Sequence, residues 1–210
     1  MNGLRDDDIC VPPNEDHWIY VHEESFIMLP NDPVSREISF GDWPIPYTDH
    51  ESFGQTAVLL PKHSEKTLVE QLYTLTSQLG KYGSLQHVKL YVDDGNLATE
   101  LKETDVIIVG KLDQFPSIGE KKDNLLIRSL EDGSLDLSAY EFIQETAQHL
   151  AWQKRSLWNE EKLMTVFTSV QESNSFISDQ LLEFIQTSLP RSPVIVESKN
   201  GECLRNKVMI

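Results

Sequence analysis

The sequence predicts an α/β fold, a mostly parallel sheet with helices on both faces, preceded by N-terminal β strands from an incomplete all-β module. Three observations support this prediction. After residue 56, short apolar runs alternate with amphipathic stretches, which is typical of βαβ units. Hydrophobic residues make up 39% of the 210 residues and charged residues 25%, so a buried core can form. Residues 1–48 lack this alternation of apolar runs and amphipathic stretches.

The N-terminal region is expected to be a separate module. Residues 18–21 and 25–29 are predicted strands, and prolines and glycines are frequent from residue 30 to residue 55. We therefore assign residues 1–48 to the terminal strands of an incomplete all-β module and a proline-rich crossing. Residues 49–200 are assigned to the α/β domain, and residues 201–210 to a tail.

Five strands are predicted in the α/β domain. The first of the five is a short apolar run of the kind that forms a buried parallel strand, and the third is the clearest buried strand in the sequence. They lie at residues 57–60, 88–92, 105–110, 163–167 and 193–197. Five strands suit a flavodoxin-like or related doubly wound sheet.

Helices are predicted between these strands. The first begins after Ser64, carries leucines on one face, and ends at Gly80. A short helix is expected at residues 97–101. Ser138 and Glu141 fit a capping box, which predicts a helix extending to Trp152.

The remaining elements are a turn and a final helix. Asp132 and Gly133 are typical of a hairpin turn. Leucine and isoleucine spacing from Leu181 to Leu189 predicts the last helix, which Pro190 ends.

Charge and cysteine content exclude several functions. Acidic residues outnumber basic ones by 34 to 18, so the net charge of −16 repels nucleic acid and anionic lipid. Cys10 and Cys203 have no zinc or redox spacing, and free thiols are favoured over a bridge between them. No apolar run reaches bilayer length, and the start is not a secretory signal. No helix or strand is predicted to open at the start, and residues 207–210 end without a stop signal, so we expect an excised piece of a longer protein.

The loops at the carboxyl ends of the strands contain no recognisable catalytic group. The loop after residue 60 lacks the glycines of a phosphate cradle, and His63 beside Ser64 is typical of a surface turn. Asp113, after the third strand, is a lone carboxylate, whereas acid–base catalysis usually needs a tuned pair. No GxSxG motif is present. We expect no enzyme activity, no cofactor and no metal.

A hydroxyl-rich loop after residue 167 is the best small-ligand candidate. Its candidate anion-binding residues precede a helix N-terminus and are Ser169, Ser173, Asn174 and Ser175. The alternative is ordinary helix capping, and Glu172 would repel a phosphate. A competing hypothesis is a nucleotide- or flavin-binding domain with a pocket over Ser169, Ser173 and Lys62.

Aromatic residues are candidates for binding carbohydrate, because flat apolar rings match the faces of sugar rings. The candidates are Trp18, Trp43, Tyr47 and Trp158. The alternative is buried packing.

Several segments resemble the BcsB family, the regulatory subunits of bacterial cellulose synthases. Residues 16–21 and 25–27 look like the last strands of its carbohydrate-binding jelly roll, and residues 43–47 (Trp-Pro-Ile-Pro-Tyr) resemble its proline-and-aromatic crossing. Residues 56–110 are similar to the first half of its flavodoxin-like domain. Residues 156–159 (Ser-Leu-Trp-Asn) resemble a Ser-Pro-Trp-Asn stretch, and Leu157 departs from it.

The resemblance implies a non-catalytic, extracytoplasmic subunit, anchored by a C-terminal helix absent from this chain. Its implied partners are the membrane-embedded catalytic subunit of the synthase and the emerging β-glucan of a biofilm. The family has been labelled as binding cyclic di-GMP, but the chain lacks the arginine motif for that ligand and has little positive charge for its phosphates.

Overall fold

The computed structural model describes residues 38–48, 55–64, 66–130, 132–138, 147–170 and 173–206. The chain divides into two units, Met1–Arg36 and Glu37–Ile210, and every described residue belongs to the second. The strands predicted at 18–21 and 25–29 lie outside the described residues, as do Cys10 and Trp18. Among the described helices, none has the length and apolar character needed to span a membrane.

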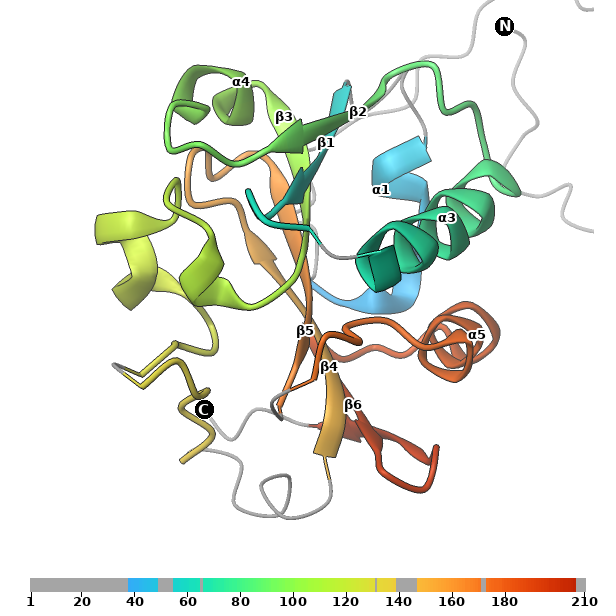
Figure 1. The fold of residues 1–210 in the computed structure, drawn as a ribbon. Coiled ribbons are helices and arrows are strands. Elements are labelled where there is room, and N and C mark those ends of the chain that lie inside the picture. The colour runs from blue at the N-terminus through green and yellow to red at the C-terminus, as the bar shows by residue number, and fades with distance from the viewer. Residues whose placement is uncertain are drawn as a thin grey trace, which may run out of the picture. The chain divides into compact units, whose positions relative to one another are not determined.

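The second unit contains a seven-stranded sheet with the order β2-β1-β3-β5-β4-β6-β7 (Figure 1). The first three adjacent pairs, β2-β1, β1-β3 and β3-β5, are parallel. The other three, β5-β4, β4-β6 and β6-β7, are antiparallel. The strands are β1 (Gln55–Leu60), β2 (Val88–Val92), β3 (Thr104–Val109), β4 (Ala147–Arg155), β5 (Leu163–Ser169), β6 (Val194–Ser198) and β7 (Cys203–Asn206).

The five predicted strands are all present, as β1, β2, β3, β5 and β6, but the sheet is mixed rather than mostly parallel. The helix predicted to extend to Trp152 is wrong over its described part, where β4 lies between β5 and β6. Trp152 pairs with Val166 of β5 on one side and with Val194 of β6 on the other. A central strand is buried on both faces, so its apolar spacing does not distinguish it from a buried helix. Strand β7 lies in the segment assigned to a tail.

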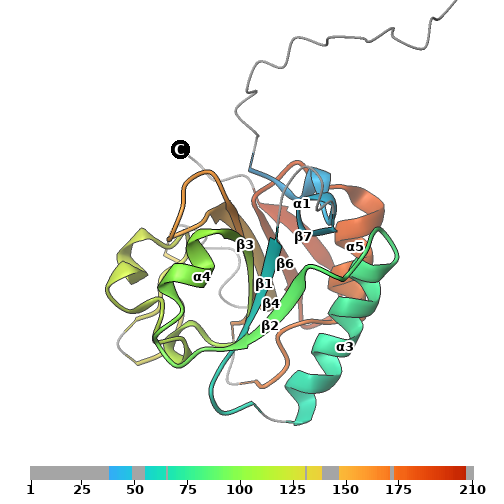
Figure 2. The same ribbon diagram turned by 90° about the horizontal axis from the view of Figure 1, so that it is seen from above.

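One face of the sheet carries the longer helices. Helices α3 (Lys66–Gly80) and α5 (Asp179–Ser188) lie on the same side, with α1 (Ile45–Thr48) beside them (Figure 2). The predicted leucine stripe of α3 is confirmed, because Leu68, Leu72, Leu75 and Leu79 are all buried against the sheet. The apolar stripe of α5 packs into the same cluster.

The other face has shorter cover. It consists of α4 (Ala98–Lys102), the 3-10 helices η2 (Leu112–Gln114) and η3 (Gly119–Asn124), and the irregular segment from residue 125 to residue 137. Ser129 and Leu135 form an isolated antiparallel bridge, which confirms the turn predicted at Asp132 and Gly133. The described part of this face therefore carries no long helix of the kind that covers a doubly wound sheet.

The segment before β1 packs onto the α/β sheet. Phe40 begins the 3-10 helix η1 (Phe40–Asp42), and Phe40, Trp43 and Tyr47 join the core cluster under α3 and α5. The Tyr47 hydroxyl is hydrogen bonded to Thr165 on β5. This part of the predicted proline-rich crossing is thus integral to the second unit.

Candidate functional site

The carboxyl ends of β3 and β5 lie next to each other and form the base of the candidate site. The chain leaves β3 at Gly110, whose N–H donates to the Phe167 carbonyl over 3.1 Å. Gly110 has a φ of 147°, and a Cβ there would lie 3.1 Å from the Phe115 ring. Glycine therefore permits the tight turn that directs Lys111 and η2 over the strand ends.

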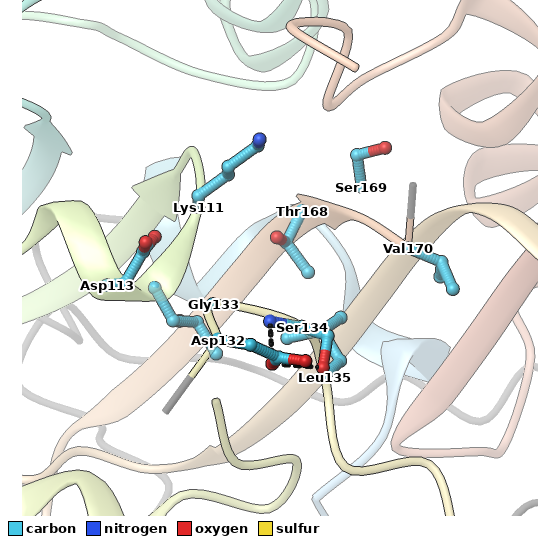
Figure 3. A pocket seen from close by; sticks show the side chains of 10 residues that line it. Lys111, Asp113, Asp132, Gly133, Ser134, Leu135, Thr168, Ser169 and Val170 are labelled. Atoms are coloured by element: carbon cyan, nitrogen blue, oxygen red, sulfur yellow. Dashed lines mark hydrogen bonds between the residues drawn. The ribbon is translucent and has the colours of Figure 1, made fainter. Parts of the chain in front are cut away.

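A pocket of about 320 Å³ lies over these strand ends (Figure 3). Its walls are the start of η2, the turn after residue 131, and the last residues of β5. The lining residues are Lys111, Leu112, Asp113, Asp132, Gly133, Ser134, Leu135, Thr168, Ser169 and Val170. Its volume is at the lower end of the range for small-molecule sites.

The turn that forms one wall has a defined hydrogen-bonding geometry. Asp132 Oδ1 accepts hydrogen bonds from the Ser134 hydroxyl at 2.6 Å and from the Ser134 N–H at 2.9 Å. The side-chain bond and then the backbone bond lower the pKa of Asp132, so this carboxylate is ionised at neutral pH. Gly133 has a φ of 82°, and a Cβ there would lie 3.1 Å from Asp113 Oδ2. Asp113 therefore approaches the turn closely.

Thr168 lies at the floor of the pocket. Its side chain is 1% exposed, and its hydroxyl has no hydrogen-bond partner in the described part of the chain. Figure 3 shows this hydroxyl on the side facing Asp113. A buried hydroxyl without a partner costs free energy, which makes the position unusual for a purely structural residue.

A cluster of buried polar side chains lies next to the strand ends that form the base of the pocket. His149 Nδ1 on β4 is 2.8 Å from Glu197 Oε2 on β6, and His149 Nε2 is 3.1 Å from the Ser175 hydroxyl. Ser178, the N-cap of α5, donates to the same carboxylate oxygen at 2.5 Å. The cluster ties β4, β6, α5 and the segment before α5 together.

Glu197 supplies the negative charge at this position. Burial raises the pKa of Glu197, but the hydrogen bonds from His149 and Ser178 outweigh burial and hold it below its ordinary value. The resulting carboxylate lies against the N-cap of α5, where an external anion would otherwise be favoured. Burial and the charge of Glu197 also raise the pKa of the nearby Cys203 thiol to about 11.

The structure brings only one of the four predicted anion-binding residues to the pocket. Ser169 lines it and donates to the Gln148 carbonyl. Ser173 accepts from the Ser175 N–H, and Asn174 accepts at its carbonyl from the Gln71 amide. The Ser175 hydroxyl is hydrogen bonded to His149, so the side chains of this loop mainly form internal hydrogen bonds that stabilise the loop.

Three of the predicted carbohydrate-binding aromatics are in the core. Trp43, Tyr47 and Trp158 are 3%, 0% and 9% exposed. Trp158 packs under the second face of the sheet, with Lys121 Nζ 5.8 Å from its ring centre. Packing, the alternative role given to these residues, accounts for their positions.

Two buried polar residues were missed at the sequence level. Gln71 interrupts the leucine stripe of α3, and its side chain bonds the backbone of Asn174, Phe176 and Ile177. His149 lies within a segment that was predicted to be helical. For Gln71 the available signal was a polar side chain on an apolar helix face, which requires a buried partner.

Comparison with known proteins identifies the class of domain to which this sheet belongs. The family model described as "Cellulose synthase BcsB, second FD domain" matches residues 37–187. These residues include η1, α1 and most of the sheet. The fold and this match define an α/β domain of the type found in BcsB.

The chain belongs to the BcsB family, as the resemblance in the sequence indicated. It is also similar to "Uncharacterized protein YdaN" of Bacillus subtilis (strain 168), with 22% identity over 204 residues. That alignment covers 97% of this chain and 29% of YdaN. The chain therefore spans less than a third of the length of this relative.

Proposed function

We propose that this chain is part of a non-catalytic accessory subunit of a cellulose or exopolysaccharide synthase. In the full-length protein it lies outside the cytoplasmic membrane, where it scaffolds the complex and guides the emerging glucan. The observation that carries this proposal is the BcsB family match over residues 37–187. Biofilm formation and any control by cyclic di-GMP are then properties of the assembled synthase.

An edge of the sheet supports the scaffolding role. Strand β2 is the terminal strand of the sheet and pairs with β1 alone within the described residues. Leu90 and Val92 on this strand are 56% and 54% exposed. Free backbone groups and exposed apolar side chains on an edge strand favour contact with another protein. We assign this edge to the catalytic subunit of the synthase.

The experiment uses the full-length protein, tagged and expressed in its source cell. The double variant Leu90→Lys/Val92→Lys places charge on the β2 edge. We expect it to co-purify with much less of the membrane-embedded glycosyltransferase, and we expect polysaccharide yield to fall with it.

Leu204→Lys is the matched control. Leu204 is 45% exposed on β7, at the opposite edge of the sheet, and this variant should retain both partner and yield. Thermal melting of each variant separates lost docking from lost folding. An unchanged amount of glycosyltransferase bound to a folded double variant would refute the assignment of this edge. If the wild-type protein bound no glycosyltransferase and its deletion left polysaccharide unchanged, the proposed function itself would fail.

A further inference from the structure

We propose that the pocket over the ends of β3 and β5 binds one sugar residue of a polysaccharide, either neutral or carrying an amino group. The inference goes beyond a scaffolding role, because it places a saccharide site in the α/β domain itself. It rests on the proposed function only for the choice of glycan.

Polar groups that have no protein partner within the described residues line this pocket, and the Thr168 hydroxyl is the buried one. Among the described residues, the Lys111 ammonium, the Asp113 carboxylate and the Thr168 hydroxyl have no hydrogen-bond partner. The bonds from Ser134 reach only Oδ1 of Asp132 and leave Oδ2 available. Figure 3 shows Asp113 and Thr168 facing each other, while the Asp132 carboxylate lies toward Ser134 and Leu135.

These groups match the hydroxyls of a sugar. Each sugar hydroxyl both donates and accepts a hydrogen bond, whereas a carboxylate only accepts and an ammonium only donates. Asp113 and Asp132 can take two hydroxyl protons, and Lys111 can donate to a hydroxyl or ring oxygen. Hydrogen bonds to charged groups are the stronger ones, so a few of them suffice to orient one sugar ring.

The charge of the pocket selects against phosphate. Its lining contributes two carboxylates and one ammonium, and the whole chain carries a net charge of −16. A nucleotide or flavin phosphate would meet repulsion both locally and at long range. An amino sugar, by contrast, would place its cation beside Asp113 and Asp132.

The apolar part of the lining is aliphatic and compatible with a sugar ring. The apolar residues among the described lining are Leu112, Leu135 and Val170, and this described lining includes no aromatic ring. Aliphatic side chains can pack against the C–H groups of a pyranose.

The test is a titration of the 15N-labelled 210-residue chain followed by NMR. The probes are cellotetraose, a glucosamine tetramer, and inorganic phosphate as the anionic comparison. We expect saturable shifts at the amides of Lys111, Gly133, Ser134 and Ser169 with either saccharide and not with phosphate. A higher affinity for the glucosamine tetramer would assign the site to a cationic glycan, which is within the proposal.

Two variants test the assignment of the pocket. Asp113→Asn removes a charge with little change of shape, and Asp123→Asn is its exposed control in η3. We expect Asp113→Asn to weaken saccharide binding by about tenfold or more and Asp123→Asn to leave it unchanged. Thr168→Val removes the buried hydroxyl, and it should weaken binding without lowering the melting temperature, since the hydroxyl has no protein partner among the described residues.

Several outcomes would overturn this inference. They are the absence of saturable shifts with either saccharide, shifts confined to another region, equal effects of Asp113→Asn and Asp123→Asn, and phosphate binding at the same amides. A negative titration with normal co-purification of the glycosyltransferase rejects the saccharide site alone. If the wild-type protein does not co-purify with the glycosyltransferase, the proposed function is rejected instead.

Discussion

The imidazole of His149 and the carboxylate of Glu197 are joined by a 2.8 Å hydrogen bond in the interior, although 48 positions separate them in the sequence. Both residues are 4% exposed. The pair connects β4 to β6, and Ser175 and Ser178 extend it to the segment that leads into α5. A buried charge of this kind is stable only while its partners remain in place.

His149→Ala should destabilise the domain by roughly 3 kcal/mol, because it leaves the Glu197 charge buried without its main partner. Urea unfolding followed by circular dichroism measures the change. His63→Ala is the matched control, since His63 is exposed, and it should change the free energy of unfolding by less than about 0.5 kcal/mol. Equal effects of the two substitutions would contradict a structural role for the buried pair.

Acid should weaken the domain through Glu197. Its folded-state pKa lies below the ordinary value of 4.5, so its contribution to stability is complete above about pH 4.5. The contribution is lost as the pH falls through the folded-state pKa, where the folded carboxylate takes up its proton. In Glu197→Gln, the free energy of unfolding should be lower at neutral pH and should decline less on acidification. Parallel pH profiles for wild type and variant would be evidence against this linkage.

Cys203 should react slowly with alkylating reagents. The pKa of about 11, caused by burial and by the charge of Glu197, leaves little thiolate at neutral pH. At about pH 8, reaction with iodoacetamide should be about 100-fold slower than for a thiol of ordinary pKa. Cys10→Ser leaves Cys203 as the single thiol, and concentrated urea provides the unperturbed reference rate. Similar rates in the folded and unfolded states would rule out the raised pKa.

Gly83→Ala should destabilise the fold by roughly 1–3 kcal/mol, because the added methyl group has no room. A Cβ at this position would lie 2.7 Å from the Thr48 carbonyl oxygen and 2.8 Å from Thr48 Cβ. Gly80→Ala is the control, since its Cβ would meet only the flexible Leu85 side chain at 3.3 Å. The melting temperature should fall for the first variant and stay nearly constant for the second.

The sequence predicted the part of the fold in which local pattern and burial agree. Strand β3 contains a continuous apolar run from Val106 to Val109, and α3 has leucines at helical spacing and ends at Gly80. Both elements form as expected, because each buries one defined set of side chains. The same reasoning failed for β4, since Ala147 and Leu150 fit a helical face as well as a strand buried on both sides. Only pairing with β5 and β6 decides between these alternatives.

The candidate site was less predictable than the fold. Asp113 and Ser169 were both noted in the sequence, but as unrelated residues in separate loops. Their proximity depends on β3 and β5 being neighbours and on the turn at Asp132 folding over the strand ends. The buried partners of His149 and Gln71 likewise come from distant segments, so no local spacing reveals them.

The position of β4 determines where the protein can be shortened. Its two neighbours, β5 and β6, both follow it in the sequence, and β6 pairs in turn with β7. A polypeptide that stops at residue 187, where the family match ends, would leave one whole side of β4 without hydrogen-bonding partners. Recombinant versions of this domain therefore need to extend through Asn206 to avoid exposing an aggregation-prone edge beside Trp152.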